Sequence, residues 1–376
     1  MSVPALVEQL KGGLDAPICL TWELTYACNL ACVHCLSSSG RRDPDELSTE
    51  EALAVVDQLA ELQVFYVNIG GGEPMIRRDF FEIVDHCIDQ NVGVKFSTNG
   101  AFIDQEAAER FAAMELLDIQ ISLDGIDPET NDAVRGEGSW QSAIAAMDHL
   151  KSAGFKNFKI SIVATRHNVD QLDQYAELAR SYEAQLRVTR LRPSGRGVDS
   201  YHDLRLSHDQ QRQIYHWLQR NPEVLTGDSF FHLNALGESL PGLNMCGAGR
   251  IVCLIDPIGD VYACPFVIHD QFNAGNLRNE GGFAHIWQNS ALFTELREPE
   301  SAGACGSCGS YDACQGGCMA TKFFTGLPLD GPDPDCVWGH ADEALATVGA
   351  GQAPRPSQDH SKPGSQPVAL SVKPRS

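Results

Sequence analysis

Strand-like and helix-like segments alternate about six times between residues 16 and 191, and this alternation constrains the fold more than any other feature. The strand-like segments are short apolar runs rich in β-branched residues, as expected for strands covered on both faces. Short connections join them to the helical segments. Such alternation predicts a parallel sheet flanked by helices. Six units are fewer than the eight of a closed barrel, so the sequence predicts an α/β fold with a partial (β/α)6 TIM-type barrel over residues 16–200.

The expected boundaries follow from the apolar periodicity and from capping signals. Ser48 and Glu51 have the spacing of a capping box, which predicts a helix start at that point. The predicted strands are 18–24, 64–69, 92–98, 117–123, 158–165 and 185–191. The predicted helices are 48–62, 79–90, 104–114, 139–153 and 169–182.

The remaining chain divides into segments that differ in composition. We expect a leader segment over residues 1–15 and a bridging helix (207–220) with linker over 201–241. Residues 242–340 hold eight cysteines, many glycines and only short strand candidates such as 251–255, which predicts a loop-rich domain held by metal. Residues 341–376, rich in Pro, Ser and Gly, predict a mostly disordered tail.

Composition excludes several classes of function. The formal net charge of −22 opposes nucleic-acid binding, which needs a basic surface. No apolar run is long enough to cross a membrane, and the N-terminus has no signal-peptide pattern. Thirteen cysteines in a chain without an export signal favour metal binding over disulfides. The sequence therefore predicts a cytoplasmic protein that binds metal.

Three of these cysteines, Cys28, Cys32 and Cys35, directly follow the first predicted strand. A structural zinc site needs four protein ligands, and no fourth Cys or His lies close by in the sequence. An iron–sulfur cubane held by three thiolates would leave one iron open to a small molecule. Three buried structural cysteines remain the alternative. His34, between two of the cysteines, is expected to pack or to support a ligand.

Other polar elements follow the next strands, where the functional groups of parallel barrels collect. The Gly70-Gly-Gly-Glu-Pro74 run follows strand two and allows close backbone approach of a ligand. Ser97–Gly100 and Ser122–Gly125 end strands three and four, although either run could be turn chemistry alone. Arg135 could pair with a ligand carboxylate or be an ordinary surface arginine.

The second cysteine array divides into two possible sets of four thiols. It comprises Cys246, Cys253, Cys264, Cys305, Cys308, Cys314, Cys318 and Cys336. Four thiolates can hold either zinc or a fully ligated iron–sulfur cluster, so the count alone does not choose the metal. Cys19 and Cys87 lie in a strand and a helix, where they are expected to be packing residues.

The first array and the Gly-Gly-Glu-Pro run together resemble the radical S-adenosylmethionine (SAM) superfamily over roughly residues 16–200. The resemblance implies that Cys28, Cys32 and Cys35 hold a 4Fe–4S cluster whose open iron binds SAM. It also implies that Gly71, Gly72 and Glu73 receive the methionine amine. Ser122 and Arg135 are implied as contacts to ribose or carboxylate. Reductive cleavage of SAM would then give a 5′-deoxyadenosyl radical.

The second array resembles the SPASM extension of peptide-modifying radical SAM enzymes, including a Gly-x4-Cys element at Gly259–Cys264. The resemblance implies two auxiliary clusters, and hence three 4Fe–4S clusters in all. The ligands implied for auxiliary cluster one are Cys246, Cys253, Cys264 and Cys318. The ligands implied for auxiliary cluster two are Cys305, Cys308, Cys314 and Cys336.

Several further stretches are similar to the mycofactocin maturase family. They include Leu20–Cys28, Val64–Pro74, Leu191–Gly197, Thr226–His232, Leu243–Gly249 and Lys322–Pro334. The resemblance implies oxidative decarboxylation of the C-terminal tyrosine of a ribosomally made precursor peptide, followed by a carbon–carbon bond to the preceding valine. It also implies a separate peptide-binding chaperone, and an external reductant whose identity the sequence does not give.

Two other functions account for part of the pattern. A sulfatase-type maturase would form formylglycine, but that family has an aspartate after the third auxiliary cysteine, where this chain has Pro265. A non-catalytic zinc or iron–sulfur scaffold would explain the cysteines and leave the Gly-Gly-Glu-Pro run unexplained. Trp22 and Tyr26, near the first array, are expected to be core residues rather than radical relays.

Overall fold

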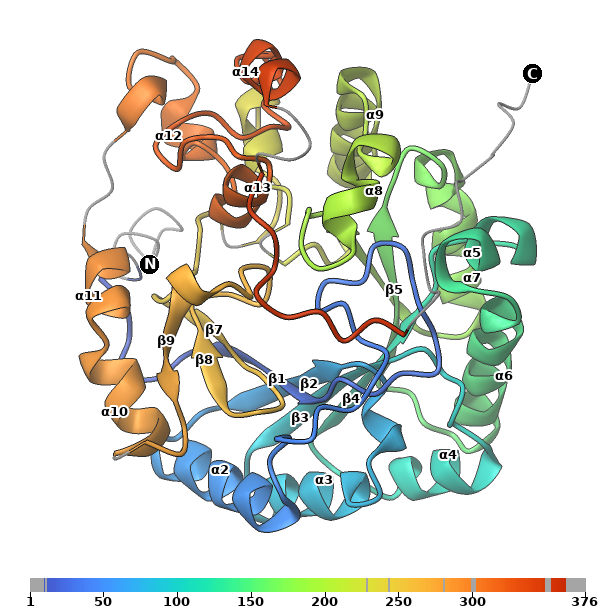
Figure 1. The fold of residues 1–376 in the computed structure, drawn as a ribbon. Helices are drawn as coiled ribbons and strands as arrows, with labels where there is room; N and C mark the ends of the chain where they lie inside the picture. Colours follow the sequence, from blue (N-terminus) through green and yellow to red (C-terminus); the bar gives the residue numbers. More distant parts are fainter. Residues whose placement is uncertain are drawn as a thin grey trace.

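A single nine-stranded sheet organises the protein, as a computed structural model shows (Figure 1). The structure describes residues 10, 12–227, 229–242, 244–279, 281–298, 302–348 and 353–362. The strand order is β6-β5-β4-β3-β2-β1-β7-β8-β9. The first six strands, all parallel, are β1 (Cys19–Thr25), β2 (Tyr66–Gly71), β3 (Gly93–Thr98), β4 (Leu117–Ser122), β5 (Phe158–Ala164) and β6 (Gln185–Arg190). The predicted partial barrel is therefore confirmed.

Helices cover the outer face of these strands (Figure 1). They are α2 (Thr49–Glu61), α3 (Phe80–Asp89), α4 (Gln105–Ala112), α5 (Pro128–Arg135), α6 (Ser139–Ser152) and α7 (Leu172–Ser181), with short 3-10 turns η1 (Pro74–Ile76) and η2 (Val169–Gln171). The predicted capping box is confirmed, since the Ser48 Oγ accepts from the Glu51 N–H and the Glu51 carboxylate accepts from the Ser48 N–H. One apolar core lies between helices and sheet and includes the fully buried Phe96 and Phe111.

The cysteine-rich region joins the same sheet rather than forming a separate layer. Strand β7 (Val252–Ile255) pairs in parallel with β1, and β8 (Asp260–Tyr262) and β9 (Asn273–Asn276) follow antiparallel. The predicted strand at 251–255 is thus confirmed. Its place beside β1 was not predicted, because a four-residue strand carries no signal for its partner.

The other helical elements lie before and after this hairpin. They are α8 (Gly197–Leu204), α9 (His208–Arg220), η3 (Phe231–Leu236), η4 (Asp270–Phe272), α10 (Gly282–Asn289), α11 (Ala291–Arg297), η5 (Gly303–Cys305), α12 (Tyr311–Cys314), α13 (Met319–Phe324) and α14 (Asp342–Thr347). Helix α9 confirms the predicted bridging helix and begins with a capping box of Ser207 and Gln210. The expected leader falls largely on residues 1–9, outside the described residues.

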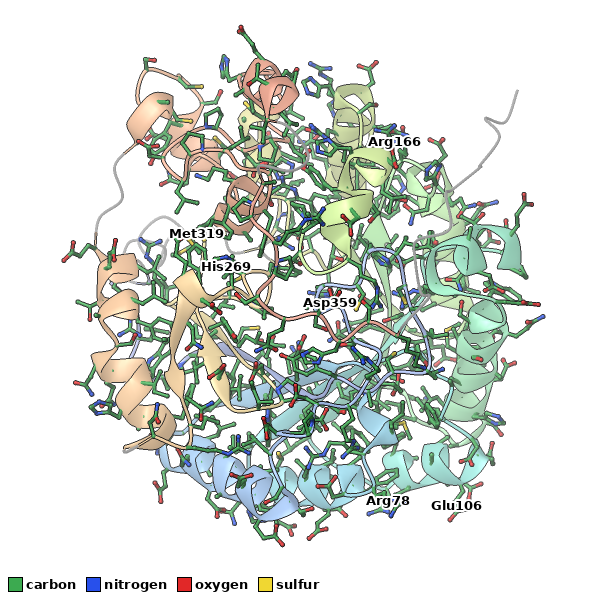
Figure 2. The ribbon with its side chains drawn as sticks, in the orientation of Figure 1. Arg78, Glu106, Arg166, His269, Met319 and Asp359 are labelled. Carbon is green, nitrogen blue, oxygen red and sulfur yellow. The ribbon has the colours of Figure 1, made fainter. Side chains whose placement is uncertain are left out.

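Residues 353–362 form a defined strap within the segment that was expected to be mostly disordered. The strap crosses the centre of the molecule in Figure 1, and Asp359 marks it in Figure 2. The Arg41 N–H donates to the His360 carbonyl (2.8 Å), and the His360 ring stacks on Tyr26 with centroids 3.7 Å apart. The Tyr26 hydroxyl also contacts the Gln358 Oε1 at 2.5 Å. Composition alone did not predict this order, which depends on contacts with residues more than 300 positions away.

Candidate active site and metal centres

The loop after β1 carries Cys28, Cys32 and Cys35 and is closed at its base by backbone hydrogen bonds. The Cys28 N–H donates to the Gly40 carbonyl (3.3 Å), and the Gly40 N–H donates to the Tyr26 carbonyl (2.8 Å). Within the loop, the Cys35 N–H donates to the Cys32 carbonyl (3.2 Å). The structure therefore holds the three predicted cysteines in one compact loop at the C-terminal end of the first strand.

Arg196, in the segment after β6, holds this loop in place through hydrogen bonds. Its Nε donates to the Cys32 carbonyl (3.0 Å) and its Nη1 donates to the Ser39 carbonyl (2.7 Å). The Arg196 side chain is buried, so these charge-assisted bonds replace its lost solvation. The sequence did not predict this role, and Arg196 was noted only within the Leu191–Gly197 stretch that resembles the family. An arginine in a turn after the last barrel strand was the available signal.

The thiols of the loop affect one another electrostatically. Burial, with smaller contributions from the nearby Cys32 and Cys35 thiols, raises the pKa of Cys28 to about 12. Burial raises the pKa of Cys32 to about 11, although the Arg135 guanidinium opposes the shift. Metal ligation requires thiolates. Without a cation these thiols therefore stay protonated, and a bound iron–sulfur cluster would supply the positive charge that lets them ionise.

The three cysteines line a cavity of about 250 Å³ at the C-terminal ends of the strands. Residues from β1 to β6, and from the loops that follow them, form its walls. They include Glu23, Gly70, Gly71, Gly72, Thr98, Asn99, Ser122, Arg135, Arg190, Arg192, Ser194 and Arg196, and Phe266 joins them from the segment after β8. Of the sequence-predicted contacts, Gly71, Gly72, Ser122 and Arg135 lie in this wall. The cavity is thus where the predicted site residues meet.

The glycines after β2 are required by backbone packing as well as by access. A Cβ on Gly72 would overlap the Ala27 carbonyl, and a Cβ on Gly71, at φ +110°, would overlap the Thr25 carbonyl. Their run is fixed on the end of β1, because the Gly72 N–H donates to the Thr25 carbonyl (2.7 Å), and on the loop after it, because the Glu73 N–H donates to the Ala27 carbonyl (2.9 Å). Gly70 differs, since a Cβ there would meet nothing within 4 Å. Gly70 is therefore the member of the run that leaves space open in the cavity.

Glu73 lies behind the cavity wall rather than in it. The side chain is fully buried and accepts from the Thr98 hydroxyl (2.9 and 3.0 Å), the Asn99 N–H (2.9 Å) and the Met75 N–H (3.4 Å). Burial raises the pKa of Glu73 to about 7, and these hydrogen bonds oppose the shift. In this arrangement Glu73 positions the strand-two and strand-three loops, and its thiol neighbour is Cys28.

A buried carboxylate connects Arg135 to the cysteine loop. Asp124 Oδ2 lies 2.7 Å from the Arg135 Nε and 2.9 Å from the His34 Nε2. Burial alone would raise the pKa of Asp124, but Arg135 and then His34 hold it well below its usual range. From the sequence, Asp124 was noted only as part of the Ser122–Gly125 run and was given no role. His34 is buried against this carboxylate, as the packing or supporting role predicted for it requires.

Glu23 is a further wall residue that sequence reasoning missed. It lies on β1 opposite Gly70 of β2, is 1% exposed, and its Oε2 has no hydrogen-bond partner among the residues that the structure describes. Burial, and then the neighbouring Asp256 carboxyl, raises the pKa of Glu23 to about 8. A carboxyl in this state is poised to hold a proton at the edge of the cavity.

The proposed ligands of auxiliary cluster two surround one small cavity. Cys305, Cys308, Cys314 and Cys336 all line a space of about 20 Å³ beside η3 and α12. Burial raises the pKa of Cys305 and Cys314, and both thiols lie within electrostatic reach of the other two. Four thiols around one cavity are the ligand set that a fully ligated iron–sulfur cluster needs.

The set expected for auxiliary cluster one is placed differently. Cys318, just before α13, is buried, and Cys246 and Cys264 are half-buried against the main core. Cys253 is fully buried on β7, where it pairs with Leu20 of β1. Burial, and then the nearby Cys19 thiol, raises the pKa of Cys253 well above its usual range. The thiol neighbour of Cys253 is therefore Cys19, which was expected to be a packing residue.

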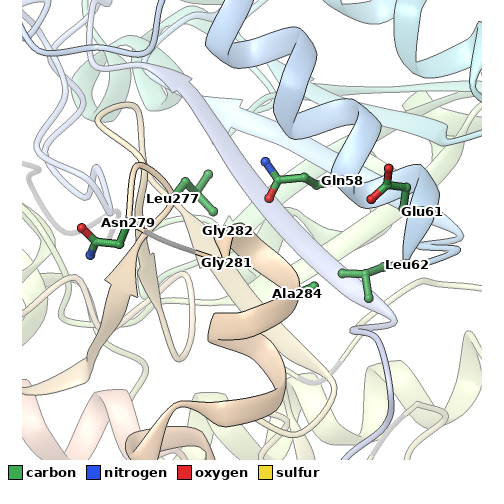
Figure 3. Close-up of a pocket in the computed structure, with 8 residues that line it drawn as sticks. All are labelled: Gln58, Glu61, Leu62, Leu277, Asn279, Gly281, Gly282 and Ala284. Atoms are coloured by element: carbon green, nitrogen blue, oxygen red, sulfur yellow. The ribbon is translucent and has the colours of Figure 1, made fainter.

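Among the described residues, no three His, Cys, Asp or Glu side chains converge as the ligands of a single metal ion do. None of the described helices is long and apolar enough to span a bilayer. A wider hollow of about 590 Å³ lies between α2 and the segment around Gly281, and Glu61 is the single titratable side chain among the described residues that line it (Figure 3).

Comparisons with known proteins agree with this geometry. The radical SAM superfamily profile matches residues 22–179, and that of the SPASM iron–sulfur cluster-binding domain matches residues 246–309. Mycofactocin maturases of Mycobacterium tuberculosis and Mycolicibacterium smegmatis are each 63% identical, covering 98% of this chain and 95% of theirs. Streptococcus suis SuiB, solved with its precursor peptide SuiA, has a similar fold (TM-score 0.67, 18% identity, 88% of this chain and 78% of that chain).

Proposed function

The chain belongs to the mycofactocin maturase family of radical SAM enzymes, and on this premise we propose that it modifies the C-terminus of a small ribosomally made precursor peptide. In the first step, hydrogen is abstracted from the β-carbon of the C-terminal tyrosine, which is then oxidatively decarboxylated. In the second step, the unsaturated tyramine product is joined by a carbon–carbon bond to the preceding valine.

The observation that carries this proposal is the loop of three cysteines in the wall of a cavity formed by strand ends. Cys28, Cys32 and Cys35 would hold a 4Fe–4S cluster with one iron left for SAM. When bound, cluster and SAM supply the 5′-deoxyadenosyl radical. The protein contributes the position of the loop, which Arg196 and the backbone bonds at Gly40 maintain.

The remaining wall residues would orient SAM and substrate. Gly71 and Gly72 hold the strand-two loop against the cysteine loop, and Gly70 leaves room for the methionine end of SAM. Glu73 keeps that loop in place and remains the proposed contact to the methionine amine, although its carboxyl lies behind the residues that line the cavity. Ser122 and Arg135 remain the proposed contacts to the ribose and carboxylate of SAM, with Asp124 orienting the Arg135 guanidinium.

Two auxiliary clusters would accept the electron that decarboxylation releases. We assign Cys305, Cys308, Cys314 and Cys336 to auxiliary cluster two, since these four line one cavity. Auxiliary cluster one is assigned to Cys246, Cys253, Cys264 and Cys318, and the position of Cys253 on β7 makes it the member that most needs testing. With the first cluster, the proposed total is three.

The proposed partners are the precursor peptide, a separate peptide-binding chaperone and an external reductant. A peptide substrate is supported by the family and by the similar fold of SuiB, whose structure was solved with its own precursor peptide. Formylglycine formation is not favoured, because Pro265 provides no carboxylate after Cys264.

The test is anaerobic incubation of the reconstituted enzyme with SAM, reductant, precursor peptide and chaperone. We expect the peptide mass to fall by carbon dioxide plus two hydrogens, with release of 5′-deoxyadenosine. Cys32→Ala is the matched control, and it should lose SAM cleavage while keeping the auxiliary clusters. SAM cleavage without any change in peptide mass would refute the substrate, and zinc in place of iron would indicate a scaffold.

A further inference from the structure

A buried charge network joins the last barrel strand to the second cysteine array. Arg190, at the end of β6, donates from Nη1 to the Asp333 Oδ2 (2.9 Å) and from Nη2 to Asp333 Oδ1. Its Nε and Nη2 donate to the Asp335 Oδ2 at 3.0 and 2.7 Å. All three residues are more than nine-tenths buried. Bidentate pairs of this kind are strong and geometrically specific.

Asp333 fixes the backbone of one cysteine from each proposed auxiliary set. Its Oδ2 accepts from the Cys318 N–H (2.7 Å), and its backbone carbonyl accepts from the Cys336 N–H (2.9 Å). Cys318 is assigned to auxiliary cluster one and Cys336 to auxiliary cluster two. A single residue therefore sets the position of both cysteines and places a negative charge between the two sites.

Arg190 also connects this charge network to the cavity at the C-terminal ends of the strands. Arg190 is one of the residues that line the 250 Å³ cavity that also contains Cys28, Cys32 and Cys35. On the opposite side it contacts the Nδ1 of the buried His232 at 3.4 Å, and His232 lines the cavity of the second cysteine set. Arg190 thus lies between the place where substrate would react and the places where the released electron would go.

The network contains equal numbers of arginine and aspartate side chains. Arg205 lies 3.1 Å from the Asp335 Oδ1, which also accepts from the Tyr201 hydroxyl (2.9 Å). Two arginines therefore face two aspartates, and removal of one member leaves an uncompensated charge in a buried region. Such a charge acts at long range because surrounding water cannot screen it.

We propose that Arg190 and Asp333 are positioning residues whose charges set the reduction potentials of the auxiliary clusters. The inference rests on the proposed function, because it presumes auxiliary clusters at these cysteines. Iron–sulfur potentials depend on net charge, solvent exposure and hydrogen bonding near the cluster. The Asp333 charge makes reduction harder, and the Arg190 charge makes it easier.

The test is anaerobic redox titration of the holoenzyme, monitored by electron paramagnetic resonance. We expect Asp333→Asn to raise an auxiliary midpoint potential and Arg190→Gln to lower it. Each change should alter the one-electron reduction equilibrium by about tenfold, which corresponds to about 59 mV. Arg190→Lys keeps the charge, so its potential should remain closer to wild type than that of Arg190→Gln. Asp85→Asn, in an exposed pair with Arg110, is the matched control and should shift nothing.

The sign of the shifts separates this proposal from a purely structural role. Equal or same-direction shifts in Asp333→Asn and Arg190→Gln, with full iron content, would overturn it. Loss of auxiliary iron from Arg190→Lys would also overturn it, because a conserved charge would then fail to preserve the site. Absence of auxiliary iron from the wild-type protein would instead refute the proposed function.

Discussion

Replacement of Asp124 by Asn tests how the cysteine loop is held. In the wild-type protein one oxygen of Asp124 accepts from the Val163 N–H (2.7 Å), and the other lies between Arg135 (2.7 Å) and His34 (2.9 Å). Asn has nearly the same shape but carries no charge and presents N–H donors to one side. Arg135 would therefore be left buried beside a neutral group, and the loop that carries the three cysteines would lose an anchor.

The expected loss follows from the burial of this pair. The side chains of Asp124 and Arg135 are 1% and 11% exposed. Removing one partner of such a pair destabilises a protein by about 3–5 kcal/mol, because a buried charge loses its compensation. The pKa of Asp124 is depressed in the folded state, so its contribution is present above the unfolded pKa and is lost as pH falls through the folded pKa. The loss in free energy of unfolding of Asp124→Asn relative to wild type should therefore be constant between about pH 5 and pH 8 and become smaller at acidic pH.

The assay is anaerobic urea unfolding followed by circular dichroism, with the free energy of unfolding taken from midpoint and slope. Asp85→Asn is the control, because Asp85 and Arg110 are 46% and 47% exposed and such pairs contribute about 0–1 kcal/mol. A loss for Asp124→Asn no larger than that of Asp85→Asn would refute the anchoring role. So would a deficit that grows as the pH is lowered.

Three other predictions concern residues that the structure places unexpectedly. Cys253→Ala should lose as much auxiliary iron as Cys246→Ala, because both are assigned to auxiliary cluster one although Cys253 lies on β7 near the Cys19 thiol; iron retained by Cys253→Ala alone would remove Cys253 from the ligand set. The folded pKa of Glu23 is raised to about 8, so its protonated carboxyl stabilises the fold at low pH and loses that contribution as the pH rises. Glu23→Gln should therefore flatten the fall in thermal stability of the apoprotein from about pH 5 to pH 8. An unchanged slope of thermal stability against pH would contradict the raised pKa. Replacing Gln358 and His360 together by Ala should lower the free energy of unfolding by about 1–3 kcal/mol, through loss of a hydrogen bond and a ring stack on Tyr26; an unaltered melting temperature would show that the strap contributes nothing.

The barrel could be predicted because its information is local. Apolar strands, amphipathic helices and the Ser48–Glu51 capping box each reflect a few neighbouring residues, and the structure has them close to the expected boundaries. The pairing of β7 with β1 and the docking of the strap on Tyr26 depend on residues far apart in sequence. No local pattern carries that information, so the sequence favoured a separate domain and a mostly disordered tail.

The candidate site shows the same division. The cysteine loop and the glycine run could be found from spacing, and both line the cavity. Glu73 could also be found, but its place behind the wall depends on donors from Thr98 and Asn99. Asp124, Arg190 and Arg196 were not assigned a role, because a single charged residue at a strand end or in the loop after it carries no pattern that identifies its partner.

The central claim is that a radical formed in this cavity removes hydrogen from the β-carbon of the substrate tyrosine. The most direct test is a precursor peptide whose C-terminal tyrosine carries deuterium at that carbon, incubated anaerobically with enzyme, SAM, reductant and chaperone. Mass spectrometry of the 5′-deoxyadenosine should then show deuterium transferred from the peptide. Decarboxylated peptide accompanied by 5′-deoxyadenosine free of deuterium would contradict the account.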